Sequence, residues 1–98
     1  MKSAAFAPEL VLVVRLERGE EIVASVLTLA KQYDIRAGSV SGIGAISGAV
    51  LGFFNLATKV YREISYAEPL EILSLSGNLS TKDGAPYAHL HASLGRET

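Results

Sequence analysis

The chain has 98 residues, a formal net charge of −1, 49% hydrophobic residues and no cysteine. This length suits one small domain with a single core, and the missing cysteines exclude a disulfide framework, a zinc finger and a thiol nucleophile. Nine basic residues are scattered among ten acidic ones, which disfavours a dedicated DNA-binding surface. A small apolar chain is expected to cover part of its surface with copies of itself. We therefore expect an oligomer, and a cytoplasmic one, because no long apolar stretch precedes Glu9.

The first half of the chain predicts a strand followed by a helix. Residues Glu9–Leu16 form a short, nearly continuous apolar run, typical of a strand that is covered on both faces. A helix is expected over Glu20–Tyr33, because acidic residues favour a helix N-terminus. Apolar residues at helical spacing give it one face toward a sheet, which consists of Ile22, Val26, Leu29 and Ala30, widened by Val23 and Leu27.

Residues 37–58 carry no charge and contain glycines at four-residue spacing, which resembles a membrane helix. Five glycines and several serines weaken that interpretation, because glycine costs about 1 kcal/mol in a helix interior. Two buried strands, Ala37–Ser47 and Ala49–Asn55, with a turn near Gly48, explain the same residues better. The glycines of Gly42–Gly48 lack the spacing of a dinucleotide-binding or phosphate-binding loop, so no cofactor-binding residue is assigned.

Three further strands are expected in the second half: Lys59–Ser65, Leu70–Leu79 and Pro86–Leu94. The last two form a hairpin with Asp83-Gly84 in its turn. On the final strand one face is packed (Ala88, Leu90, Ala92, Leu94), and the other carries Tyr87, His89, His91 and Ser93. The sequence thus predicts an α+β fold, with one amphipathic helix packed on a mainly antiparallel β-sheet.

The chain has only two histidines, His89 and His91, and strand periodicity places them on the same face. Imidazole suits zinc and other divalent transition metals, so this pair is the candidate metal site. A catalytic zinc needs about three protein ligands, so a third must come from Glu71, from a neighbouring subunit or from a segment beyond this chain. The alternative is two polar residues that hydrogen-bond on a half-exposed strand.

Arg15 lies near the end of an apolar run, where it is either a surface residue or a structural anchor for a carboxylate such as Glu71. These two residues are the candidates for a pocket or structural anchor. The serines do not occur in a nucleophile elbow, and no catalytic residue is assigned. We expect no enzymatic activity, and the weaker alternative is an enzyme that uses metal-bound water at the histidine pair.

Four blocks in the order expected for one known family carry a resemblance that spans nearly the whole chain. They are Arg15–Ile22, Ser39–Ala45, Glu71–Asn78 and Asp83–Ala92. Together they resemble the plants-and-prokaryotes-conserved (PPC) domain, which also occurs fused to AT-hooks in plant nuclear proteins. The resemblance implies an α+β homotrimer that acts through self-association and protein partners. In the plant proteins the AT-hook binds DNA, and stand-alone prokaryotic members are often labelled DNA-binding by analogy. Some members look like metal-binding proteins that use the histidines of the His-Leu-His-Ala block. In this sequence those histidines are His89 and His91.

In such members a histidine of a later Gly-Gly-His-Leu block joins this pair. The present sequence ends at Gly95–Thr98, before that block, so we expect a shortened chain or a partner strand from another chain. The hypothesis is a homotrimeric PPC-like module that self-associates and binds a metal ion, such as zinc, or a small ligand near the histidines. The alternative is a DNA-associated transcriptional regulator, which the near-zero charge disfavours.

Overall fold

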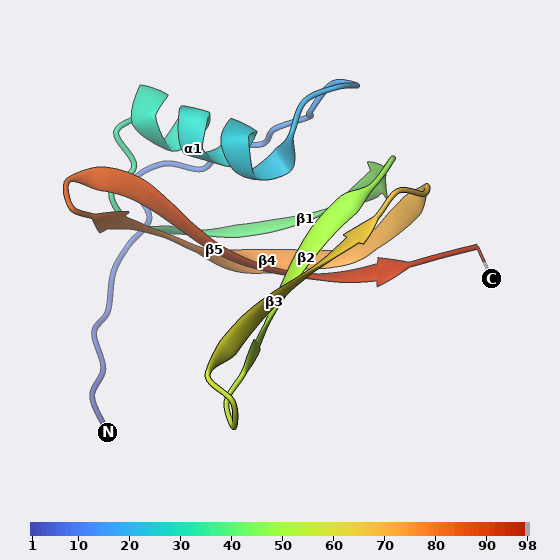
Figure 1. The fold of residues 1–98 in the computed structure, drawn as a ribbon. Helices are drawn as coiled ribbons and strands as arrows, with labels where there is room; N and C mark the ends of the chain where they lie inside the picture. The colour runs from blue at the N-terminus through green and yellow to red at the C-terminus, as the bar shows by residue number, and fades with distance from the viewer. Residues whose placement is uncertain (98) are drawn as a thin grey trace.

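The computed structural model describes residues 1–97 and has an α+β architecture. Within these residues the helix and strands follow in the order α1 (Ile22–Gln32), β1 (Gly38–Ile46), β2 (Ala49–Asn55), β3 (Val60–Tyr66), β4 (Leu70–Lys82) and β5 (Ala85–Gly95). Strands β1, β4 and β5 form an antiparallel sheet in the order β1-β4-β5, and β2 pairs only with β3. Helix α1 lies over one face of the three-stranded sheet (Figure 1). The predicted α+β class, with one helix on a mainly antiparallel sheet, is confirmed.

Helix α1 is capped by an acidic side chain, as its N-terminal sequence indicates. The carboxylate of Glu21 accepts hydrogen bonds from the backbone N–H groups of Val23 (3.1 Å) and Ala24 (2.6 Å), which would otherwise lack partners. The helix therefore begins at Ile22, two residues later than expected. Ala30 is buried at the centre of the face toward the sheet, but Val23 is 43% exposed and does not widen that face.

The β4–β5 hairpin is longer than expected because its turn has only two residues. Asp83 and Gly84 both have positive φ (52° and 79°), as in the type I′ turn that matches the twist of antiparallel strands. Strand pairing consequently continues up to Lys82 and Ala85 on either side of the turn. The central strand β4 supplies most of the buried apolar side chains, which are Leu70, Ile72 and Leu79 together with Ala30 of the helix.

The two faces of β5 follow the predicted alternation. Ala88, Leu90 and Leu94 are half-buried, whereas the side chains of His89 and His91 are exposed. Helix α1 contacts β5, so the half-buried residues face the helix and the histidines lie on the opposite face of the sheet. Ala92, expected on the packed face, is exposed.

The two strands expected over Ala37–Ser47 and Ala49–Asn55 are present as β1 and β2, but the prediction that they are buried is wrong. They belong to different sheets, because β1 pairs with β4 and β2 pairs with β3. The β2–β3 hairpin extends beyond the three-stranded sheet (Figure 1), and most of its large apolar side chains are exposed, including Val50, Phe53, Phe54, Val60 and Tyr61. A two-stranded hairpin is marginally stable on its own in water, so these side chains need a further packing partner.

The predicted strand at Glu9–Leu16 is also wrong. Residues 10–17 are extended chain without strand pairing, and Val11 and Val13 are 78% and 97% exposed. The composition favours a strand, but a strand also requires a neighbour for its backbone groups. Among residues 1–97, no strand pairs with this segment, so it forms no ladder.

The molecular surface is unusually large for the mass of the chain. The accessible surface is 8517 Å², whereas a compact monomer of this mass exposes about 5,400 Å². The radius of gyration is 15.2 Å, against about 13 Å for a compact domain of this length. Much apolar surface is thus left for a partner to cover. No helix in residues 1–97 is long and apolar enough to cross a membrane.

Candidate metal centre

The two histidine side chains converge on one another. Their Nε2 atoms lie 3.0 Å apart, and the ring centroids are 5.0 Å apart with an angle of 33° between the ring planes. A hydrogen bond at this distance needs one Nε2 that carries a proton and one that does not. Each neutral imidazole has one unprotonated ring nitrogen, which is the atom that binds metals.

The spacing of the two nitrogens fits a shared metal ion. Two imidazole nitrogens that bind one zinc at 2.0–2.1 Å with a tetrahedral angle are about 3.3 Å apart. The observed 3.0 Å between the Nε2 atoms needs only a small rotation of either ring to meet that geometry. His89 and His91 thus have the donor type and nearly the separation of two ligands of one divalent transition metal.

A third protein ligand does not come from the same part of the chain. Among residues 1–97, no group of three His, Cys, Asp or Glu side chains is placed to hold a metal ion. Glu71 pairs with Gly95, four residues beyond His91, which is about 13 Å along the strand. Glu71 of the same chain is therefore out of reach of the histidine pair.

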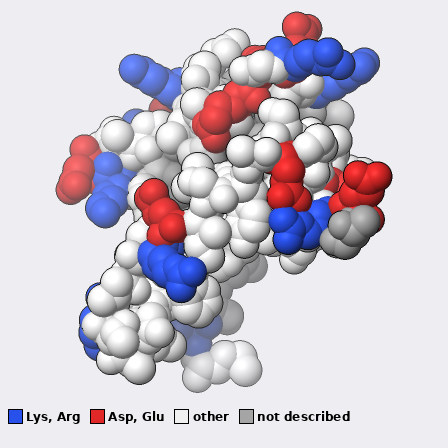
Figure 2. Space-filling view, turned by 45° about the vertical axis from the view of Figure 1, so that its right-hand side comes forward, with Lys and Arg blue, Asp and Glu red and all other residues white. Residues whose placement is uncertain are grey.

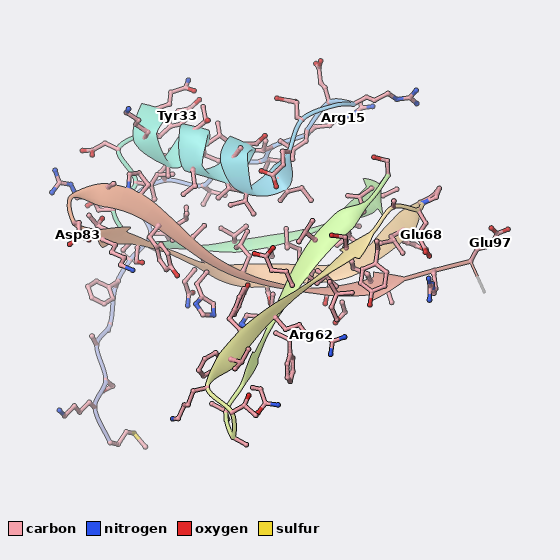
Figure 3. The ribbon with its side chains drawn as sticks, viewed as in Figure 1. Arg15, Tyr33, Arg62, Glu68, Asp83 and Glu97 are labelled. Atoms are coloured by element: carbon pink, nitrogen blue, oxygen red, sulfur yellow. The ribbon has the colours of Figure 1, made fainter. Side chains whose placement is uncertain are left out.

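Arg15 and Glu71 do not form an ion pair with one another in the described residues, and both side chains are exposed. Arg15 lies in the segment that leads into α1 (Figure 3), where it lines a shallow hollow with its sequence neighbours Leu16, Glu17 and Arg18. The structure gives no anchoring contact to either residue.

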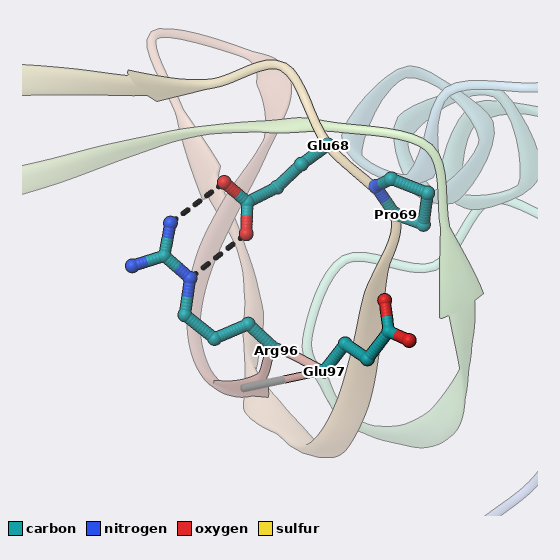
Figure 4. A pocket seen from close by; sticks show the side chains of 4 residues that line it. All are labelled: Glu68, Pro69, Arg96 and Glu97. Atoms are coloured by element: carbon teal, nitrogen blue, oxygen red, sulfur yellow. Dashed lines mark hydrogen bonds and ion pairs between the residues drawn. The ribbon is translucent and has the colours of Figure 1, made fainter.

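A different ion pair, which the sequence analysis missed, joins the two ends of the β4–β5 hairpin. Arg96 donates from Nε to one carboxylate oxygen of Glu68 (2.8 Å) and from a terminal nitrogen to the other (2.7 Å) (Figure 4). The hydrogen bonds from Arg96 hold the pKa of Glu68 below its ordinary value. The pairing register of the β4–β5 hairpin would have indicated this ion pair. It places Gly95 opposite Glu71 and so brings Arg96 close to Glu68.

Charged groups form no continuous basic surface on the face shown in Figure 2. Lysine and arginine side chains lie there beside aspartate and glutamate, in small mixed groups. Phosphate backbones bind to concentrated positive charge, and such concentration is not visible on this face.

The sequence profile of the Plants and Prokaryotes Conserved (PCC) domain matches residues 4–98. The chain belongs to this family. It is the plants-and-prokaryotes-conserved (PPC) family that the four sequence blocks indicated, so that prediction is confirmed. Among curated proteins, none matches this chain.

Solved structures with the same fold include three from prokaryotes. The metal-containing protein AF0104 from Archaeoglobus fulgidus is 40% identical, with a TM-score of 0.82 over 86% of this chain and 60% of that one. A candidate DNA-binding protein from Bacteroides thetaiotaomicron is 41% identical, with a TM-score of 0.74 over 78% and 53% of the two chains. A plant- and prokaryote-conserved protein from Pyrococcus horikoshii is 31% identical, with a TM-score of 0.79 over 94% and 68%. The PCC chain described here therefore spans little more than half the length of the first two.

Proposed function

We propose that this PCC domain is a self-associating module that binds a divalent transition metal ion, such as zinc, through His89 and His91. The observation that carries the proposal is the 3.0 Å separation of the two Nε2 atoms, which is close to that of two ligands on one metal. The resemblance to a metal-containing protein that is 40% identical supports it further. Water, a neighbouring subunit or a further polypeptide segment supplies the remaining ligands.

Self-association is supported by the surface that the chain leaves uncovered. The excess over a compact monomer, obtained by subtracting about 5,400 Å² from 8517 Å², is about 3,100 Å². A standard interface covers about 800 Å² on each partner. The excess is therefore more than one such interface covers, and a homotrimer, in which each chain contacts two neighbours, would cover about 1,600 Å² of it. The exposed apolar hairpin β2–β3 is the proposed contact surface.

The metal proposal is tested by equilibrium dialysis against zinc followed by elemental analysis. We expect between one zinc per trimer and one per chain in the wild type, and loss of this zinc in His89→Ala and in His91→Ala. Ser93→Ala is the matched control, because Ser93 lies on the same strand and face but is not a proposed ligand. Zinc that is absent from the wild type, or retained in both histidine variants, would refute the metal site.

The self-association proposal is tested by light scattering coupled to size-exclusion chromatography. We expect the mass of a trimer for the wild type and a lower mass for Phe53→Asp, because Phe53 is 64% exposed on the hairpin and a buried carboxylate is costly. Phe6→Asp is the control, since Phe6 is 90% exposed in the extended N-terminal residues. A monomeric wild type, or a Phe53→Asp variant of unchanged mass, contradicts the proposal.

Regulation through DNA is a second candidate, which rests on relatives described as candidate DNA-binding proteins. The formal net charge of −1 argues against it. Duplex binding that weakens steeply with rising salt would favour this function, and binding that is absent at low salt would dismiss it.

A further inference from the structure

Helix α1 lies over an edge of the three-stranded sheet. The strand order is β1-β4-β5, and α1 packs mainly against β5, which is an edge strand. A helix with its side chains is about 10 Å wide, whereas neighbouring strands lie about 4.8 Å apart, so one helix covers about two strands. A helix placed over an edge strand therefore extends beyond the sheet.

The apolar side chains between α1 and the sheet are incompletely covered. On the helix only Ala30 is buried, while Ile22, Val26 and Leu29 on the same face are half-buried. On β5, Leu90 faces the helix and is also half-buried. A further strand beside β5, with apolar side chains directed toward α1, would cover these residues.

The backbone of β5 is open to such a strand. Within residues 1–97, β5 (Ala85–Gly95) pairs on one side only, with β4, so alternate N–H and C=O groups on its other side have no strand partner. No residue of β5 is a lysine, arginine, aspartate or glutamate, and only Pro86, next to the turn, lacks an N–H group. The opposite edge, β1, is less regular, because a bulge between Gly42 and Gly44 interrupts its pairing.

The segment Leu10–Leu16, which we call the N-terminal arm, has the properties of a strand without a partner. It is extended, and among residues 1–97 no strand pairs with it. Alternate residues on one side of it are all apolar, and none of them is buried: Leu10, Leu12, Val14 and Leu16. The arm is followed by a turn in which Glu20 donates its backbone N–H to the carbonyl oxygen of Glu17 (3.1 Å). No second turn or strand holds its other end, so the arm can reach a neighbouring molecule.

We propose that the N-terminal arm of one copy pairs with the free edge of β5 in a neighbouring copy, as a fourth strand of that sheet. The apolar side of the arm then lies beneath α1 of the neighbour, where the half-buried residues need cover. This inference rests on the self-association proposed above and adds a second contact to it, distinct from the β2–β3 hairpin. The contact joins two different surfaces, so each chain donates one arm and accepts another, and three such contacts can close into a ring.

Proline substitution in the arm tests the backbone pairing. Val13→Pro and Val14→Pro are both needed, because consecutive N–H groups of a strand point in opposite directions and only one of the two is directed at β5. Proline removes that donor and cannot continue a ladder. We expect at least one of the two variants to associate about tenfold more weakly than the wild type in sedimentation equilibrium. Ala5→Pro is the matched control, because Ala5 is exposed and lies outside the arm.

Hydrogen exchange locates the contact on the accepting strand. In the wild-type oligomer we expect protection of the β5 amides that do not bond to β4, and faster exchange of these amides in the proline variant that weakens association. The amides of α1 should keep their protection, which shows that the variant is folded.

The outcomes separate this inference from self-association itself. Wild-type affinity in both proline variants overturns the pairing of the arm and leaves self-association standing. Outer β5 amides that exchange freely in the wild-type oligomer, or that stay protected in both proline variants, also overturn it, because the edge is then open or covered by another segment. A wild type that is monomeric at all concentrations overturns both proposals.

Discussion

Replacement of Gly77 by alanine is expected to separate strands β4 and β5 at the histidine pair. Gly77 lies opposite Leu90 in the middle of β4. A Cβ atom added to Gly77 would lie 2.0 Å from the carbonyl oxygen of His89 and 2.8 Å from Cα of Leu90. Both of these atoms belong to the backbone, so no side-chain rotation can relieve the overlap and the strands themselves must move.

The magnitude follows from two opposed effects. Overpacking costs about 1–3 kcal/mol, and the upper end applies here because the neighbours are backbone atoms. Restriction of the unfolded chain returns about 0.5 kcal/mol, as for other changes from glycine to alanine. We therefore expect Gly77→Ala to lower the free energy of unfolding by about 2.5 kcal/mol.

Gly42→Ala is the matched control for this prediction. Its added Cβ would lie 3.6 Å from a methyl carbon of Leu75, which is ordinary contact, so we expect a small gain of about 0.5 kcal/mol. Urea unfolding followed by circular dichroism measures both variants at one protein concentration, because association changes the apparent stability. Equal stabilities of Gly77→Ala and Gly42→Ala would refute the close approach of β4 and β5 at Gly77.

Three further predictions concern the helix cap, the hairpin ends and the core. Glu21→Ala should lower the free energy of unfolding by about 1 kcal/mol, because two backbone N–H groups lose their acceptor; urea unfolding measures it, and an unchanged midpoint would contradict the cap. Because folding lowers the pKa of Glu68, its contribution to stability is present above the ordinary value of 4.5 and is lost as pH falls through the lower, folded pKa. Glu68→Gln should therefore be less stable than the wild type at neutral pH. Thermal unfolding across the acid range should show that this difference in stability narrows below pH 4.5. A stability difference that does not change with pH would exclude the ion pair as its cause. Leu79→Ala should cost about 3 kcal/mol, since Leu79 is only 8% exposed, and a loss below about 1 kcal/mol would place Leu79 outside the core.

Local sequence patterns predicted the elements that are stabilised by near neighbours. The Asp83-Gly84 dipeptide specifies a tight turn, and the alternation after it places His89 and His91 on one face, as the structure has them. The helix was predicted with most of its sheet-facing residues, although Val23 is exposed. It begins later than expected, because the capping carboxylate is provided by Glu21 rather than by an earlier residue.

Strand pairing was the part that the sequence could not predict. Residues 9–16 and 49–55 are both predominantly apolar, and the first segment is richer in valine, yet only the second forms a strand. The difference lies in the partner: Val50 and Leu51 pair with Ser65 and Ile64, whereas no strand of the described residues pairs with the first segment. Composition reports the tendency of a segment to extend, and pairing depends on residues far along the chain.

The candidate site was predicted by residue type but not by its surroundings. Strand periodicity placed the two histidines together, and the 3.0 Å contact of their Nε2 atoms adds the orientation that periodicity lacks. Glu71 was a plausible third ligand while only its strand was known. The register excludes it, because Glu71 is paired with Gly95 rather than with a residue near His91.

The incomplete histidine site and the uncovered hairpin point to the same requirement. A chain of 10.4 kDa that exposes 8517 Å² leaves many apolar side chains uncovered, and within residues 1–97 the two histidines proposed to bind metal have no third ligand. Hydrophobic burial supplies the driving force for association, but it has little directional preference. Metal coordination has a fixed geometry, so a ligand from a second chain would select one arrangement among those that apolar contact allows. Self-association and metal binding would then be thermodynamically linked, each strengthening the other.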